Sequence, residues 1–129
     1  MQAVGHFHVK LTPQAAAPGI ESAGLGRMTI DKRFEGELAA HSLGEMLAFR
    51  TAVSGSAGYV AMERVDGSLN GRRGSFVLQH SGTMNRGESS LALTVVPDSG
   101  TGELAGLTGA MTLEIKSGMH YYHFDYQLP

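Results

Sequence analysis

Apolar and polar residues alternate with a period of two along most of this chain, which is the pattern of β-strands that bury one face. The clearest run extends from Gly58 to His80 and is interrupted only by Asn70-Gly71. That dipeptide tolerates positive φ at both central positions of a tight turn, so we predict two long antiparallel strands joined by a type I′ turn. The turn sets Leu69 opposite Arg72 and thereby fixes the register of both strands.

This register predicts which side chains share a face. Counting outward from the turn places Val65 opposite Phe76, Glu63 opposite Leu78 and Ala61 opposite His80. The more apolar face, which we expect to point inward, carries Tyr59, Ala61, Glu63, Val65, Leu69, Phe76, Leu78 and His80. The outward face carries Val60, Met62, Arg64, Asp66, Ser68, Arg73, Ser75, Val77 and Gln79. A carboxylate and an imidazole are therefore expected inside, as diagonal neighbours within reach of each other.

The same alternation predicts the other strands at residues 4–11, 25–34, 37–52, 89–96, 110–116 and 119–128. Residues 12–22 are expected to form a loop with at most one helical turn, and the glycine-rich residues 99–109 a short helical turn. Gly44 lies in mid-strand, where a bulge or a close backbone approach is expected. The last hairpin turns at Ser117-Gly118, and its register pairs Ile115 with His120, Leu113 with Tyr122 and Met111 with Phe124.

About eight strands joined by short hairpins, with no long helix, predict an all-β chain. We expect residues 1–129 to form a single domain, a closed antiparallel barrel built as a meander. The interior of an eight-stranded barrel is either filled by side chains or holds one small ligand. The function of this chain depends on which of the two applies.

Composition narrows the classes of partner. The 129 residues carry a formal net charge of -2, and their lysines and arginines are scattered, so neither a nucleic acid nor a membrane surface is expected as a partner. Cysteine is absent, which excludes disulfides, thiolate metal sites and thiol nucleophiles. No apolar run approaches the length of a spanning helix, and the first residues lack a signal-peptide pattern. We therefore expect a cytoplasmic protein whose partner is a small apolar ligand.

Glu63 and His80 are the best candidates for catalytic residues. An interior carboxylate fixes the tautomer of a neighbouring imidazole and raises its basicity, and such a pair can shuttle a proton. The alternative is a structural role, in which the two buried side chains hydrogen-bond to each other and fix the strand register. The residues expected to line the lumen and bind a ligand are Tyr59, Phe76, Leu78, His120, Tyr122 and Phe124.

Neither a metal nor a cofactor is predicted. His6 and His8 lie on one strand face at a spacing that metal sites use, but Thr12 stands where a carboxylate four residues on would complete the set. Residues 100–105 match a shortened dinucleotide fingerprint, but residues 111–115 have the period of a strand, whereas the fingerprint needs a helix.

Four segments carry a resemblance that covers nearly the whole chain: residues 58–65 (GYVAMERV), 74–80 (GSFVLQH), 99–109 (SGTGELAGLTG) and 120–126 (HYYHFDY). With these motifs in this order, the chain resembles a small bacterial family described as domain of unknown function 3224. The resemblance implies a calycin-like barrel similar to that of plant allene oxide cyclase. Barrels of that wider group shape small apolar molecules without a cofactor, but their catalytic residues have no motif match here, so none is carried over.

Two functions stay open. The first is a small-molecule barrel, either a binder or a cofactor-free isomerase or cyclase, which a cavity of several hundred Å³ reaching Glu63 would favour. The second is a structural or protein-interaction barrel without enzymatic activity, which a lumen packed with aromatic side chains would favour. In either case the outward apolar stripe of Val60, Met62 and Val77 predicts a homodimer or higher oligomer.

Overall fold

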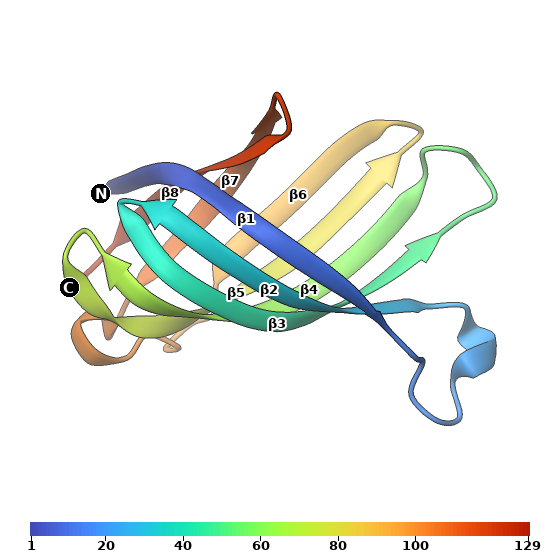
Figure 1. Cartoon of the computed structure of the whole chain (residues 1–129), viewed down its shortest axis with the longest axis horizontal. Helices are drawn as coiled ribbons and strands as arrows, with labels where there is room; N and C mark the ends of the chain where they lie inside the picture. The colour runs from blue at the N-terminus through green and yellow to red at the C-terminus, as the bar shows by residue number, and fades with distance from the viewer.

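The computed structural model describes residues 1–129 as eight antiparallel strands closed into a barrel (Figure 1). Each strand pairs with the next along the chain, and the last pairs with the first. The strands are β1 (Gln2–Gln14), β2 (Gly26–Gly36), β3 (Leu38–Arg50), β4 (Ala57–Leu69), β5 (Arg72–Asn85), β6 (Glu88–Val95), β7 (Thr108–Lys116) and β8 (Met119–Gln127). The predicted all-β barrel is confirmed. Two short 3-10 helices, η1 (Glu21–Ala23) and η2 (Gly102–Leu104), interrupt the connections, and neither is long or apolar enough to cross a membrane.

Strand pairing is extensive around most of the barrel and minimal at one place. β3 and β4 pair along thirteen residues of each strand, from Leu38 opposite Leu69 to Arg50 opposite Ala57. β6 and β7, by contrast, share the single pair Thr94 and Ala110. The barrel is therefore closed by one short link at this seam.

The central hairpin β4–β5 has the predicted turn and register. Asn70 and Gly71 adopt φ values of 47° and 83°, as a type I′ turn requires. Ala61 faces His80 and Glu63 faces Leu78 in the predicted register. The register predicted for the last hairpin is also confirmed, with Ile115, Leu113 and Met111 opposite His120, Tyr122 and Phe124.

Two local expectations differ from the structure, and a third is confirmed. β1 continues through Pro13 to Gln14. Proline has no N–H to donate to a neighbouring strand, but β8 pairs with β1 only as far as Phe7, so that edge of β1 needs no donor at Pro13. β2 extends through Gly36, so the turn into β3 falls at Glu37, after the predicted position. At Gly44 the structure shows the second of the two expected features, a close backbone approach without a bulge: Gly44 pairs in register with Glu63, and a Cβ there would collide with the carbonyl oxygen of Met62.

One end of the barrel is packed solid. The connection from β6 to β7 folds inward at η2, where Leu104 and Leu107 are buried and close this end. The hydroxyl of Tyr122 accepts a hydrogen bond from the backbone N–H of Leu38 at 2.9 Å and ties β8 to β3. The core at this end comprises Ala3, Phe7, Phe34, Leu38, Val65, Leu69, Phe76, Leu78, Leu93, Val95, Leu104, Leu107, Met111, Tyr122, Phe124 and Tyr126.

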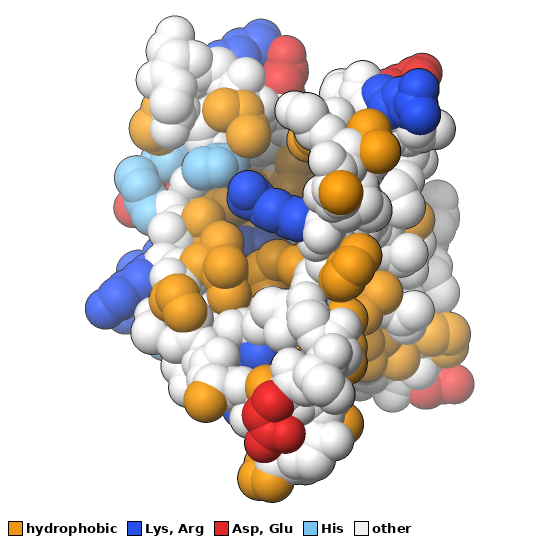
Figure 2. Space-filling model, turned by 90° about the vertical axis from the view of Figure 1, so that its right-hand side faces the viewer, with side chains coloured by type: hydrophobic (Ala, Val, Ile, Leu, Met, Phe, Trp, Pro, Cys, Tyr) orange, Lys and Arg blue, Asp and Glu red, His pale blue; other side chains and the backbone are white.

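The opposite end is open. It carries the β1–β2, β3–β4, β5–β6 and β7–β8 connections (Figure 1). Large side chains at inward strand positions are 40% or more exposed here, namely Leu11, Met84, Leu91 and Ile115. Figure 2 looks at this end and shows a hollow surrounded mostly by hydrophobic side chains, with one Lys or Arg side chain lying across it. The barrel thus has a packed half and an open, apolar mouth.

Candidate functional site

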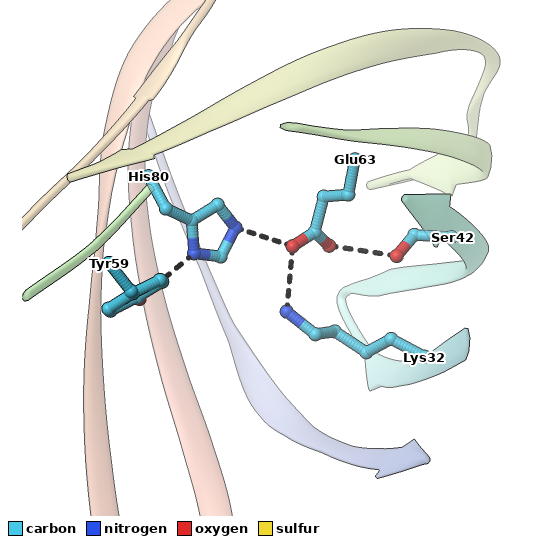
Figure 3. A network of polar contacts seen from close by, with 5 residues as sticks. All are labelled: Lys32, Ser42, Tyr59, Glu63 and His80. Carbon is cyan, nitrogen blue, oxygen red and sulfur yellow. Dashed lines mark hydrogen bonds and ion pairs between the residues drawn. The ribbon is translucent and has the colours of Figure 1, made fainter. Parts of the chain in front are cut away.

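A buried polar network lies between the packed half and the mouth, with side chains from four neighbouring strands (Figure 3). Glu63 is at its centre. Its Oε2 lies 2.5 Å from His80 Nε2 and 2.9 Å from Lys32 Nζ, and its Oε1 accepts a hydrogen bond from Ser42 Oγ at 2.8 Å. His80 Nδ1 lies 3.2 Å from the hydroxyl oxygen of Tyr59. The network therefore runs from Tyr59 through His80 to a carboxylate held by a lysine and a serine.

The barrel wall explains why these polar groups are inside. Lys32 takes an inward position on β2, where its Nζ lies 4.6 Å from the ring centre of Phe7 and 5.3 Å from that of Phe34. Aromatic faces attract a cation, so the lysine gains stabilisation beyond its ion pair. Glycine at position 44 leaves the space next to the backbone of Glu63 free. No buried side-chain nitrogen or oxygen lacks a hydrogen-bond partner.

The charges in the network are fixed by its contacts. Burial alone would raise the pKa of Glu63, but the hydrogen bond from His80 and the positive charge of Lys32 outweigh it and lower this pKa to about 2. Glu63 is then ionised at neutral pH and only accepts hydrogen bonds, so His80 must donate from Nε2. When the imidazole carries its single proton on Nε2, Nδ1 is an acceptor and receives a hydrogen bond from the Tyr59 hydroxyl.

Tyr59 is the half-buried member of the network and lies near the start of β4, which follows the β3–β4 connection at the mouth. Its ring packs closely over β5 at Gly82, where a Cβ would come within 2.5 Å of Tyr59 Cε1. Burial, and to a lesser extent the negative charge of Glu63, raises the pKa of the phenol. Tyr59 is therefore a neutral hydroxyl at physiological pH, backed by an imidazole and a carboxylate.

The predicted site residues divide into three groups. Glu63 and His80 contact each other, as the hairpin register predicted, and their catalytic role stays a prediction. Tyr59 and His120 are half-buried, and the His120 ring stacks on Phe7 with centroids 5.1 Å apart. The other four predicted lining residues are almost completely buried in the packed core, where a ligand would have to displace their neighbours: Phe76, Leu78, Tyr122 and Phe124.

Sequence analysis missed two members of the network, Lys32 and Ser42. Lys32 could have been found, because it lies two residues from both Ile30 and Phe34 and therefore shares the buried face of its strand with them. Ser42 carries no such signal, because a small hydroxyl residue is common on either face of a strand.

A cavity of about 650 Å³ lies against the outward face of β3, β4 and β5 and under the β1–β2 connection. The stripe predicted from Val60 and Met62 forms part of its wall. Its lining includes His80 but not Glu63. The remaining lining residues are Ala16, Ala17, Ile20, Leu25, Arg27, Glu45, Met46, Leu47, Ala61, Gln79 and Ser81. This cavity is a groove on the barrel exterior, distinct from the mouth.

The comparisons with known proteins agree with the fold. The family model described as "Protein of unknown function (DUF3224)" matches residues 3–126. A crystal structure of a protein with unknown function from the DUF3224 family of Shewanella oneidensis MR-1 is 53% identical, with a TM-score of 0.93 over 100% of this chain and 97% of that one. No curated protein matches the chain. Both positive matches span nearly the whole barrel, and the chain therefore belongs to the DUF3224 family of proteins of unknown function.

Proposed function

We propose that this protein is a small-molecule-binding barrel whose ligand enters the open mouth and meets the hydroxyl of Tyr59. The observation that carries the proposal is the contrast between the two ends of the lumen: inward apolar side chains pack at one end and stay exposed at the other. Ligand sites are typically apolar concavities with a few convergent polar groups. Here the half-buried member of the polar network is Tyr59, supported by His80.

The chemistry of the mouth indicates the class of ligand. Its exposed inward side chains are aliphatic or thioether groups, such as Leu11, Met84 and Leu91, so the body of the ligand is apolar. Lys32 and Glu63 neutralise each other in a buried ion pair, so the pair itself presents no net charge to a ligand. Because the Tyr59 hydroxyl donates its hydrogen bond to His80, its oxygen is free to accept a hydrogen bond from a ligand. The ligand is therefore an uncharged, mostly apolar molecule that carries a hydroxyl or similar donor.

The same arrangement supports isomerisation without a cofactor. The phenol oxygen of Tyr59 takes a proton from the ligand while its own proton passes to His80 Nδ1, which becomes an imidazolium ion facing the carboxylate of Glu63. Returning the proton to a different ligand atom yields an isomer and restores the site. Glu63 acts through His80 in this scheme and does not touch the ligand.

A second candidate is a structural barrel with no activity. Two observations favour it: the aromatic side chains of one half fill the lumen there, and every buried polar side-chain atom already has a partner inside the protein. In that case Tyr59 only caps His80. The two candidates differ in whether removing the Tyr59 hydroxyl changes the affinity for a small molecule.

The test is a ligand-observed NMR screen of uncharged, hydroxylated apolar compounds against the wild type, Tyr59→Phe and Tyr121→Phe. Tyr121 is 40% exposed on an outward position of β8 and serves as the matched control. Loss of one hydrogen bond predicts an affinity about tenfold weaker for Tyr59→Phe and unchanged for Tyr121→Phe. Absence of any bound compound, or equal binding by all three proteins, would support the structural barrel.

The proposal includes a cytoplasmic location, because a chain without cysteine suits a reducing compartment. Fractionation of the native cells tests it, and recovery of the protein outside the cytoplasm would contradict it.

A further inference from the structure

Three potential metal ligands meet on the outward face of β1 and β2. His6 lies directly opposite Glu35 in the strand register, and His8 follows two residues later on the same face. Oε2 of Glu35 lies 2.5 Å from His6 Nε2 and 3.7 Å from His8 Nε2. The ligand atoms of all three side chains lie within 4.8 Å of one another. The sequence supplies the two histidines, and strand pairing supplies the carboxylate that was missing at position 12.

These separations suit a single metal ion. In a tetrahedral site with bonds of about 2.1 Å, neighbouring ligand atoms lie about 3.4 Å apart. The two histidine–carboxylate distances, 2.5 and 3.7 Å, fall on either side of that value. The imidazole rings of His6 and His8 stand nearly perpendicular, at 89°, with centroids 5.5 Å apart, so they do not stack against each other. Side-chain exposures of 33%, 61% and 56% for His6, His8 and Glu35 leave room for the small rotations that would equalise the distances.

The backbone that carries these ligands is held in place. The carbonyl oxygen of Glu35 accepts a hydrogen bond from the Tyr122 hydroxyl at 3.0 Å. Gly5 approaches the same carbonyl so closely that a Cβ would collide with it. β1 is paired with β2 on one side of His6 and with β8 on the other. Supporting groups that fix the ligands in this way are typical of functional metal sites.

We propose that His6, His8 and Glu35 bind a divalent first-row transition-metal ion such as Zn²⁺, a site additional to the proposed ligand site in the mouth. Two imidazole nitrogens and one carboxylate oxygen favour Zn²⁺ and its neighbours over Mg²⁺ or Ca²⁺. Three protein ligands leave a coordination position for water. Arg33 lies opposite His8 in the register and adds a positive charge nearby, so the ion is exchangeable and not permanently held.

The test is calorimetric titration of the full chain, prepared without a histidine tag, with ZnCl₂. The wild type is expected to bind one Zn²⁺ per chain and no Mg²⁺. His8→Ala and Glu35→Gln are each expected to weaken Zn²⁺ binding at least tenfold, because replacing even a group behind a metal ligand costs about 10- to 100-fold. Co²⁺ supplies an independent signal through its visible absorption bands.

The barrel offers matched controls on the same wall. His41 Nε2 and Asp31 Oδ1 form an exposed pair 2.7 Å apart that lacks a second histidine. His41→Ala and Asp31→Asn are expected to leave Zn²⁺ binding unchanged. No stoichiometric Zn²⁺ binding, or an equal loss of binding in the control variants, would overturn the proposal. His8 and Glu35 are exposed, so their variants are expected to fold; if one does not, His8→Gln or Glu35→Ala takes its place and is judged by the same tenfold criterion.

Discussion

Replacing Glu63 with glutamine removes one charge from the centre of the buried network and changes the side-chain volume very little. Lys32, which is only 5% exposed, then has no carboxylate partner. The amide can still accept one hydrogen bond, but it cannot neutralise an ammonium ion in a site closed to water. We expect Glu63→Gln to lower the free energy of unfolding substantially at neutral pH.

The size of the loss follows from the pKa. The pKa of Glu63 lies at about 2 instead of the ordinary 4.5, and at about 1.36 kcal/mol per pKa unit this difference corresponds to about 3 kcal/mol. Removing one partner of a buried ion pair costs about 3 to 5 kcal/mol, which is the same range. For a chain of this length, a loss of about 3 kcal/mol lowers the melting temperature by about 10 °C.

The pH dependence has a definite sign. Folding depresses the pKa of Glu63, so its stabilisation is fully present above about pH 4.5 and disappears as the pH falls toward 2. The wild type should therefore lose about 3 kcal/mol more than Glu63→Gln over this acid range. The two proteins should be most alike near pH 2.

Urea unfolding followed by circular dichroism, at several pH values from 7 to 2, measures both effects. Glu114→Gln is the control, because Glu114 is exposed and its contact with Lys116 is 3.4 Å long. We expect this control to stay within about 0.5 kcal/mol of the wild type. The reasoning fails if Glu63→Gln is equally close to the wild type at pH 7, or if it keeps the full acid dependence of the wild type.

Two further substitutions test other parts of the structure. Gly82→Ala would place a methyl group 2.5 Å from the Tyr59 ring, so the ring must move away from His80; we expect a loss of about 1 to 3 kcal/mol in urea unfolding. Gly58→Ala is its control, because the nearest atom to a Cβ there is 3.8 Å away, and an equal loss in both variants would contradict the close-packing argument. We also propose that the outward stripe on β4 pairs with the same stripe of a second copy, because Val60 and Met62 are about half exposed beside the exterior groove. Sedimentation should then show a homodimer or higher oligomer that Met62→Glu dissociates; a wild-type monomer at tens of micromolar, or an oligomer unaffected by the substitution, would count against this interface.

The contact between Glu63 and His80 could be predicted because a two-residue turn determines the pairing of every residue in both strands. Once Asn70-Gly71 is recognised, counting along the hairpin leaves no freedom. Glu35 beside His6 could not be found in this way. β1 and β2 are joined by a connection of eleven residues, so no tight turn sets their register. Pairing across a long loop depends on how the whole barrel closes.

The packed lining residues show a second limit of the sequence. Alternation indicates that Phe76 and Phe124 face inward, and both do. It does not indicate how far along the barrel axis each one lies, or that η2 folds in and closes that end with Leu104. Whether an inward side chain lines a mouth or fills a core depends on that depth.

The single residue pair between β6 and β7 affects how the barrel can move. A cylinder of hydrogen-bonded strands opens most readily where the fewest bonds must break, and here that place is the contact of Thr94 with Ala110. Parting these strands turns the cylinder briefly into a curved sheet with two edges, while the β1–β5 wall that carries Glu63 and His80 keeps its ladder. We therefore expect local opening of the barrel to begin at this seam and to leave the polar network assembled.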